Sequence, residues 1–307
     1  MIKYYRTMDH QIHEISEPME GTWISLIHPT AAELAKIATD YKIDIDDLRA
    51  PLDEEERSHI EVEEGYTLFI VDVPTTEERK EKEYFLTIPC GIILTEKVII
   101  TVCLEDTAVL ADFKNGRVRN FWTFKRTRFI LQILYRNASL YLQYLRIIDK
   151  KSDSVEKQLH ISTKNQELIE LLELEKSLVY FSTSLRSNEL VLEKMLKIKQ
   201  YPEDEELLDD VIIENKQAIE MADIYSNILS GTMDAYASVI SNNLNIVMKV
   251  LAIITIVMSI PTMIASFWGM NVPVPLAHSA HGFLILVIVS LILTIFGGYI
   301  LGKKNMF

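Results

Sequence analysis

The sequence predicts an α+β membrane protein, in which an N-terminal α/β domain and a long helical stalk precede two membrane spans joined by a short loop. Three observations predict this fold class. All 44 acidic residues lie before Ala235, the last of them being Asp234. Two long, uncharged, apolar stretches occur after that point, and short apolar runs typical of strands occupy the first third of the chain. The chain therefore has an acidic front and an apolar tail.

The charge of the front part restricts its partners. Residues 1–234 contain 28 basic and 44 acidic side chains, a formal charge of −16. This surface excludes nucleic acid as a partner, because nucleic-acid binding requires net positive charge, and it favours attraction of cations. Cys90 and Cys103 lie within apolar, strand-like runs, which indicates a reducing compartment rather than a disulfide framework. The polar opening residues predict no signal peptide.

The two apolar stretches are Val250–Trp268 and Gly282–Leu301. Each has the length of a helix that crosses about 30 Å of hydrocarbon. The alternative is a pair of buried core helices, but both stretches are apolar on every side. Lysines flank the two stretches and are absent from the loop between them, so the positive-inside rule places both termini in the cytoplasm. Two spans cannot enclose a pore, so any conducting form must be an oligomer.

The front part shows the signals of a compact α/β domain. Thr30, with Glu33 three residues later, predicts the N-cap of a helix that continues to Tyr41. Period-two apolar runs predict strands over 22–27, 66–73, 85–94 and 97–103. The expected core residues are Trp23, Leu26, Leu68, Ile70, Ile92, Leu94 and Ile99.

Helical periodicity dominates after this domain. Residues 121–195 read as helical with few breakers, and Tyr201-Pro202-Glu203 indicates a stop followed by a new helix start. From Pro202 one helix of roughly 65 residues, close to 100 Å at about 1.5 Å per residue, could continue into the first span. It carries an apolar seam at heptad spacing, which predicts a stalk that holds subunits together: Ile212, Ile219, Ala222, Ser226, Leu229, Met233, Tyr236 and Ile240.

The tripeptide Gly269-Met270-Asn271 ends the first span, before a short loop, a second span and a basic tail. This arrangement resembles the CorA metal-ion transporter family, whose signature is this triplet. The segment 244–251 is similar to the family's pore-helix start, and Thr22-Trp23-Ile24, residues 45–48, Arg57 and residues 66–70 are similar to its N-terminal domain.

The resemblance implies a homopentameric funnel in the cell membrane, with five first spans around the pore. The boundaries expected from it are residues 1–118 for the cytoplasmic α/β domain, 119–244 for the stalk, 245–270 for the pore helix, 271–281 for the outer loop, 282–302 for the second span and 303–307 for the cytoplasmic basic tail.

The resemblance also assigns roles along the expected pore. Gly269, Met270 and Asn271 would form the selectivity filter, in which amide and carbonyl oxygens bind a hydrated Mg2+ that gives up water reluctantly. Asn271 has an alternative role as a helix C-cap. Asn245 would form a polar ring near the cytoplasmic end, and Met248 and Leu251 apolar constrictions that gate by dewetting. For Leu251, packing against lipid or a neighbouring helix is the alternative.

The same resemblance implies that Asp47, Asp210 and Asp234 are regulatory metal ligands between subunits, where bound Mg2+ would relieve carboxylate repulsion and close the pore. Ordinary solvated carboxylates are the alternative for each of them. The outer loop lacks the acidic residue that family members often carry. Its two histidines, His278 and His281, are spaced to share a softer ion such as Zn2+, Co2+ or Ni2+, although ordinary loop residues are the alternative.

The expected function is therefore uptake of Mg2+, or of Co2+ or Ni2+, down the electrochemical gradient. One alternative is a proton-coupled Zn2+ transporter of the ZntB branch, and another is a membrane-anchored adaptor that conducts nothing. No enzyme motif is present. The absence of a Walker loop also argues against an ATP-driven pump, so no ATP is expected as a partner in transport.

Overall fold

The structure is a computed structural model that describes residues 1–79, 82–159, 165–198, 204–272, 274–275 and 279–303. Contacts within the chain divide it into two compact units, Met1–Gly231 and Thr232–Phe307. The predicted stop and restart at Tyr201-Pro202-Glu203 falls outside the described residues.

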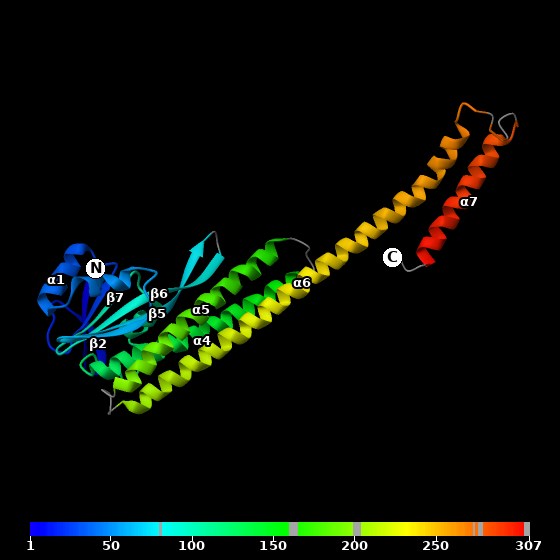
Figure 1. The fold of residues 1–307 in the computed structure, drawn as a ribbon. Helices are drawn as coiled ribbons and strands as arrows, with labels where there is room; N and C mark the ends of the chain where they lie inside the picture. Colours follow the sequence, from blue (N-terminus) through cyan, green and yellow to red (C-terminus); the bar gives the residue numbers. More distant parts are fainter. Residues whose placement is uncertain (80–81, 160–164, 199–203, 273, 276–278, 304–307) are drawn as a thin grey trace. The chain divides into compact units, whose positions relative to one another are not determined.

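The first unit is built on a mixed sheet, which in the described part of the chain has seven strands (Figure 1). The order is β2-β1-β3-β7-β6-β5-β4. Among the strand pairings of the described residues, only β3–β7 is parallel, and it aligns Trp23 with Ile99. The strands are β1 (Ile2–Met8), β2 (Gln11–Ile15), β3 (Trp23–Ile27), β4 (His59–Glu63), β5 (Tyr66–Arg79), β6 (Lys82–Thr95) and β7 (Ile99–Cys103). The four predicted strands correspond to β3, β5, β6 and β7.

Helices cover both faces of the sheet. Successive strand residues point to opposite sides, so neighbouring residues of one strand pack against different helices. Leu68 and Ile70 pack with α1 (Ala31–Tyr41) and α2 (Ile45–Arg49). Phe69, between them, packs on the other face with α3 (Ala108–Lys114) and the long helices. A short 3-10 helix, η1 (Ala50–Leu52), follows α2. The predicted core is confirmed except at Leu94, which is half-buried at the edge of the hydrophobic cluster that contains Phe69.

The predicted capping box opens α1. The Thr30 hydroxyl accepts from the Glu33 amide at 3.3 Å, and the Glu33 carboxylate accepts from the Thr30 amide at 2.8 Å. This reciprocal pair satisfies amides that the first helical turn leaves unpaired, so the helix begins where the sequence predicts.

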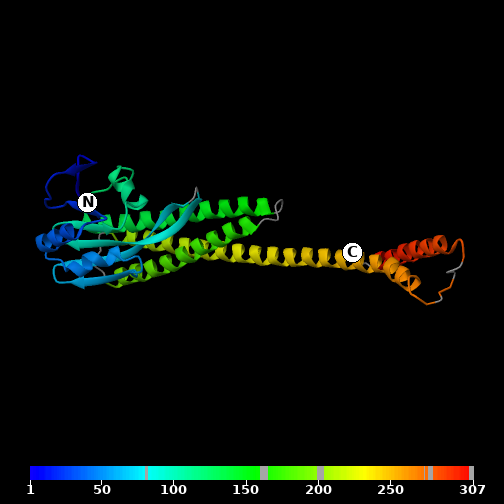
Figure 2. The same cartoon turned by 90° about the horizontal axis from the view of Figure 1, so that it is seen from above.

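Two 34-residue helices, α4 (Arg126–Leu159) and α5 (Asn165–Ile198), lie side by side against the sheet (Figures 1 and 2). They form the helical region that the sequence predicts over 121–195. α6 (Glu205–Trp268) follows as one helix of 64 residues, also as predicted.

The first half of the α6 seam is covered by the chain itself, so its interpretation as a contact between subunits is wrong there. Ile219, Ala222 and Leu229 are buried within the first unit. Polar contacts beside them join α6 to α4 and α5, including a bond from Asn215 Nδ2 to the Leu185 carbonyl at 3.1 Å. The heptad pattern here reports a helix packed on its own neighbours, and Ile240 further along is exposed.

The second unit contains the end of α6 and α7 (Gly282–Lys303). Both helices are long and apolar enough to cross a membrane, and only 6% and 0% of their most apolar windows are buried. The alternative of two buried core helices is therefore wrong. Within this unit the helices pack closely, since a Cβ added to Gly297 of α7 would lie 2.9 Å from Ile260 Cδ1 of α6.

Candidate functional site

The Gly-Met-Asn triplet begins directly after the last helical residue, Trp268. The Gly269 amide donates to the Ala265 carbonyl at 2.9 Å and completes the final turn. A Cβ on Gly269 would lie 3.3 Å from the same carbonyl oxygen, so the helix end favours glycine by close approach rather than by a left-handed backbone.

Asn271 is exposed, and its amide has no hydrogen-bond partner among the described residues. It lies three residues beyond Trp268, and its backbone is not left-handed. The alternative role as an αL helix C-cap is therefore wrong. The amide is free to face an ion or water.

The outer loop is tied to the helix end, because Trp268 Nε1 donates to the Pro275 carbonyl at 3.1 Å. His281 is exposed just before α7, and its carbonyl accepts from the Ile285 amide. His278 lies outside the described residues, so the structure does not describe the expected histidine pair. In the described ranges, no three His, Cys, Asp or Glu side chains are grouped to hold a metal.

The predicted inner positions all lie on exposed parts of α6. Asn245 is exposed, and Met248 and Leu251 each keep 59% of their surface accessible. In a single chain, these side chains therefore face no protein partner that would fix a packing role.

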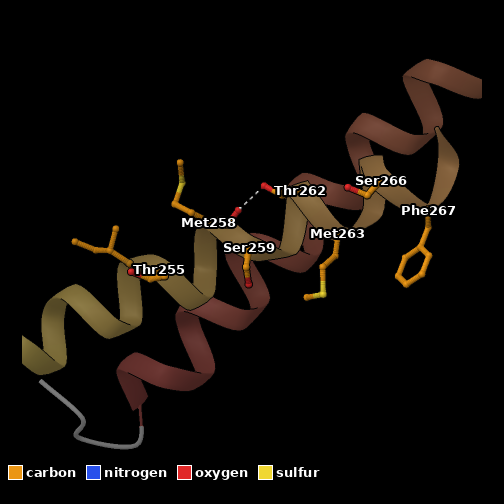
Figure 3. Close-up of a pocket in the computed structure, with 8 residues that line it drawn as sticks. Thr255, Met258, Ser259, Thr262, Met263, Ser266 and Phe267 are labelled. Atoms are coloured by element: carbon orange, nitrogen blue, oxygen red, sulfur yellow. Dashed lines mark hydrogen bonds between the residues drawn. The ribbon is translucent and has the colours of Figure 1, made fainter. Parts of the chain in front are cut away.

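A polar stripe continues from these positions toward the triplet, and the sequence analysis missed it. Hydroxyl side chains recur at alternating spacings of four and three residues, which places them on one face of a helix. They line an open groove with a volume of about 580 Å3 (Figure 3). The hydroxyl residues are Thr255, Ser259, Thr262 and Ser266, and the rest of the lining is apolar: Ile254, Met258, Met263 and Phe267.

The same spacing extends back through Asn245, Met248 and Ala252. Leu251 fits the same spacing, because it lies three residues after Met248 and four before Thr255, so it shares this face with Ala252. The signal was present in the sequence, but it is hidden in a stretch that looks uniformly apolar by composition.

The hydroxyls on this stripe are compatible with a membrane helix. Those of Thr255, Ser259 and Thr262 donate to carbonyls of their own helix at 2.8, 2.7 and 3.2 Å. Each oxygen keeps lone pairs for an outer partner, because a hydroxyl donates once and can accept twice. These three hydroxyls therefore present acceptors whose own donors are already paired, a chemistry suited to a hydrated cation.

The opposite side of α6 faces α7. Ile253 is only 7% exposed, and Ile260, seven residues later on the same side, contacts Gly297. The first-span helix thus has an apolar side covered by α7 and a polar stripe that α7 leaves open.

The three predicted regulatory carboxylates do not meet within one chain. Asp47 is half-buried on α2 and accepts a hydrogen bond from Tyr66 Oη at 2.5 Å. Burial, reinforced by this bond to Asp47, raises the pKa of Tyr66 to about 12. Asp210 is exposed on α6 without a side-chain partner among the described residues.

α2 and the start of α6 pack on opposite faces of the sheet, so Asp47 and Asp210 cannot share an ion within one chain. Asp234 is exposed in the second unit, where its carbonyl accepts from Ser238 Oγ at 3.0 Å. A metal at any of these carboxylates needs further ligands from outside the chain or from water.

Comparison with known families decides the identity of this arrangement. The profile of the CorA-like Mg2+ transporter protein family matches residues 19–303. The chain belongs to this family. Membership makes it a divalent-cation transporter of the membrane rather than an enzyme or a non-conducting adaptor.

Individual relatives agree with this assignment. The cobalt/magnesium transport protein CorA of Methanocaldococcus jannaschii is 28% identical over 305 residues, covering 94% of this chain and 93% of that protein. The complete structure of the CorA magnesium transporter from the same organism matches with a TM-score of 0.85 at 23% identity, over 100% of this chain and 99% of that one. This likeness confirms the predicted fold.

The ZntB branch is a more distant neighbour. The cytoplasmic domain of ZntB from Vibrio parahaemolyticus RIMD 2210633 matches with a TM-score of 0.62 at 9% identity, covering 78% of this chain and 98% of that domain. At this identity the likeness shows a shared fold and carries no argument about Zn2+.

Proposed function

We propose that this transporter is a Mg2+ channel formed by five copies of the chain, with the polar stripe of α6 lining the pore. The carrying observation is the stripe itself, which α7 leaves open and which ends at the free amide of Asn271. One chain presents only one such stripe, so several copies are needed to surround an ion.

Gly269, Met270 and Asn271 act as the selectivity filter in this proposal. Mg2+ holds its water tightly. Neutral oxygens can hydrogen-bond to the hydrated ion without stripping it, and the hydroxyl ring of each turn continues this environment along the pore. Co2+ transport fits the same pathway, since the archaeal relative is named for cobalt and magnesium.

Met248 is the proposed gate, because its exposed apolar side chain stands on the stripe between polar rings. A ring of such side chains excludes ions by dewetting. Leu251, three residues later on the same exposed face, would form a second apolar ring. Mg2+ bound between subunits at Asp47, Asp210 and Asp234 would hold the gate closed. With both termini in the cytoplasm, the membrane potential drives uptake at about 2.3 kcal/mol per charge per 100 mV.

The test is ion flux into liposomes that contain the purified chain and a Mg2+-sensitive dye, under an inside-negative potential. We expect wild-type flux to be lost in Asn271→Ala and strongly reduced in Asn245→Ala. Asn243→Ala is the matched control, because it removes the same amide from an exposed α6 position off the stripe. Its flux should remain within about twofold of wild type.

Other outcomes would contradict the proposal. Equal loss of flux in Asn243→Ala and Asn245→Ala would show that the stripe does not line the pathway. Zn2+ entry that requires a pH gradient, without Mg2+ entry, would favour the proton-coupled zinc alternative.

A further inference from the structure

One region of this acidic chain is strongly basic. Between Asp112 and Asp149 the sequence contains eight Lys or Arg residues and no Asp or Glu, although the whole chain carries a formal charge of −13. The transport function uses none of these side chains, and attraction of a cation would be opposed by them. The region therefore points to an anionic ligand.

Part of this segment lines a cavity of about 440 Å3 in the first unit. The cavity lies where the end of α3, the loop after it, α4 and the start of α6 come together. Leu207 of α6 and Val118 contribute apolar walls, and the polar lining consists of Arg117, Arg119, Arg136, Asp112, Gln132 and Tyr135. The volume suits a small molecule rather than a protein segment.

The charges in the cavity are unbalanced. Among the described residues of the lining, Asp112 is the only carboxylate, and its side chain is 9% exposed. Arg117 Nη1 donates to one of its oxygens at 3.1 Å, and Arg136 Nε donates to the other at 2.6 Å. Three guanidinium groups and one carboxylate leave a net charge of about +2 on the lining.

Many donors remain for a ligand. Each guanidinium carries five N–H donors, and the bonds to Asp112 use only a few of those on Arg117 and Arg136. Arg119 is exposed and has no hydrogen bond or ion pair within the described ranges. The carbonyl oxygen of Gln132 is buried without a partner and can accept from a ligand hydroxyl or amino group. The buried Asp112 thus holds the guanidinium groups of Arg117 and Arg136 in place, while that of Arg119 is free to bind an anion.

We propose that this cavity binds a phosphate-bearing small anion, either inorganic phosphate or pyrophosphate or the phosphate chain of a nucleotide. Phosphate supplies several oxygens with a charge near −2, which matches both the fork geometry and the excess charge of the arginines. A single carboxylate would neutralise only half of that charge. The site is built from residues of the first unit alone, and it does not depend on which cation the protein transports.

Calorimetric titration of the purified full-length chain, freed of divalent cations on a chelating resin, tests the proposal. The probes are inorganic phosphate, pyrophosphate and ATP. We expect one saturable site per chain, with pyrophosphate and ATP bound about tenfold more tightly than phosphate because they carry more charge. Similar affinities for pyrophosphate and ATP would identify the phosphates as the whole recognition element, and a further gain for ATP would assign a contribution to the nucleoside.

Arg119→Ala should weaken pyrophosphate binding about tenfold, because it removes charge-assisted hydrogen bonds. Arg119→Lys keeps the charge but loses the planar guanidinium, so its affinity for pyrophosphate should lie between those of wild type and Arg119→Ala. Lys125→Ala is the matched control, since Lys125 is an exposed cation of the same basic segment that does not line the cavity. It should change the affinity less than about twofold.

Two results would overturn the proposal. One is the absence of saturable binding of any probe below about 10 mM. The other is an equal loss in Arg119→Ala and Lys125→Ala, which would mean diffuse attraction to a basic surface. Because Arg119 is exposed and unpaired, neither variant threatens the fold.

Discussion

The two units of this protein differ in how much of their apolar surface the chain itself buries. In the first unit the sheet is covered on both faces, and aromatic and aliphatic side chains meet in two dense clusters. In the second unit, two apolar helices touch each other along one side and expose most of their surface. The first unit therefore contains its own stabilising contacts, whereas the second requires a membrane and, in the proposed channel, further copies. The ion pathway lies in the unit that is incomplete by itself.

The strongest test of this contrast compares two phenylalanines. Phe129 is fully buried in the first unit, and Phe267 is 68% exposed in the second. Phe129→Ala should lower the free energy of unfolding of the first unit by about 3–5 kcal/mol, because it leaves a cavity in the core. Phe267→Ala should change it by less than about 0.5 kcal/mol. Thermal unfolding of the full chain in detergent, followed by near-UV circular dichroism, measures both; similar losses would break the comparison.

Two adjacent glycines of α7 test the same contrast between packed and exposed positions within the second unit. Gly297 packs against Ile260, whereas a Cβ on Gly298 would meet nothing within 4 Å. Gly297→Leu should force α7 away from α6 and lower the free energy of unfolding by about 1–3 kcal/mol. Gly298→Leu should cost less than about 0.5 kcal/mol. The heat resistance of the purified chains on size-exclusion chromatography reports the difference, and equal behaviour would show that this side of α6 is not a packing surface.

Two asparagines test the same contrast for polar groups. Asn188 is 3% exposed, accepts from the Asp72 amide at 2.9 Å and donates to the Asp72 carbonyl at 2.8 Å. Asn188→Ala leaves buried groups unpaired and should cost about 1–3 kcal/mol in urea unfolding. Asn243 is exposed on α6, and Asn243→Ala should leave the free energy of unfolding nearly unchanged. A near-zero effect at Asn188 would mean that water replaces its bonds.

The smallest expected effect concerns pH. Burial raises the pKa of Asp72, against the opposing hydrogen bonds of Ser184 and Ser58. A carboxyl whose folded-state pKa is raised stabilises the fold below its unfolded-state pKa, and this contribution is lost as pH rises through the folded-state pKa. Asp72→Asn should therefore gain stability relative to wild type between pH 4 and pH 7. Paired urea titrations across that range check the sign, and a relative loss would reverse the interpretation.

Local features of the first unit could be predicted from the sequence because their causes are local. The capping box of Thr30 and Glu33 involves neighbours in the chain. The strands around Leu68 and Ile92 were predictable because alternation between the two faces of a sheet appears in the order of neighbouring residues. Leu94 was misjudged because burial at a strand end depends on what covers it.

The candidate site was only partly predictable. The position of Gly269-Met270-Asn271 at the helix end follows from the length of the apolar stretch, and the structure agrees. The hydroxyl stripe required knowing which side of α6 is covered by α7. The hydrogen bond that engages Asp47 comes from Tyr66, which is distant in sequence, so spacing alone could not reveal it.

The sequence by itself determined the acidic front, the two apolar spans, the start of the first helix at Thr30, four of the strands and the family signature. These depend on composition and on the order of neighbouring residues. Only the tertiary structure decided what covers each face. Ile219, Ala222 and Leu229 pack within the chain, Thr255 and Ser259 remain open, and three arginines line one cavity together with Asp112. A periodic pattern shows that a helix has an apolar or polar face, but the partner of that face is set by contacts between residues far apart in the chain.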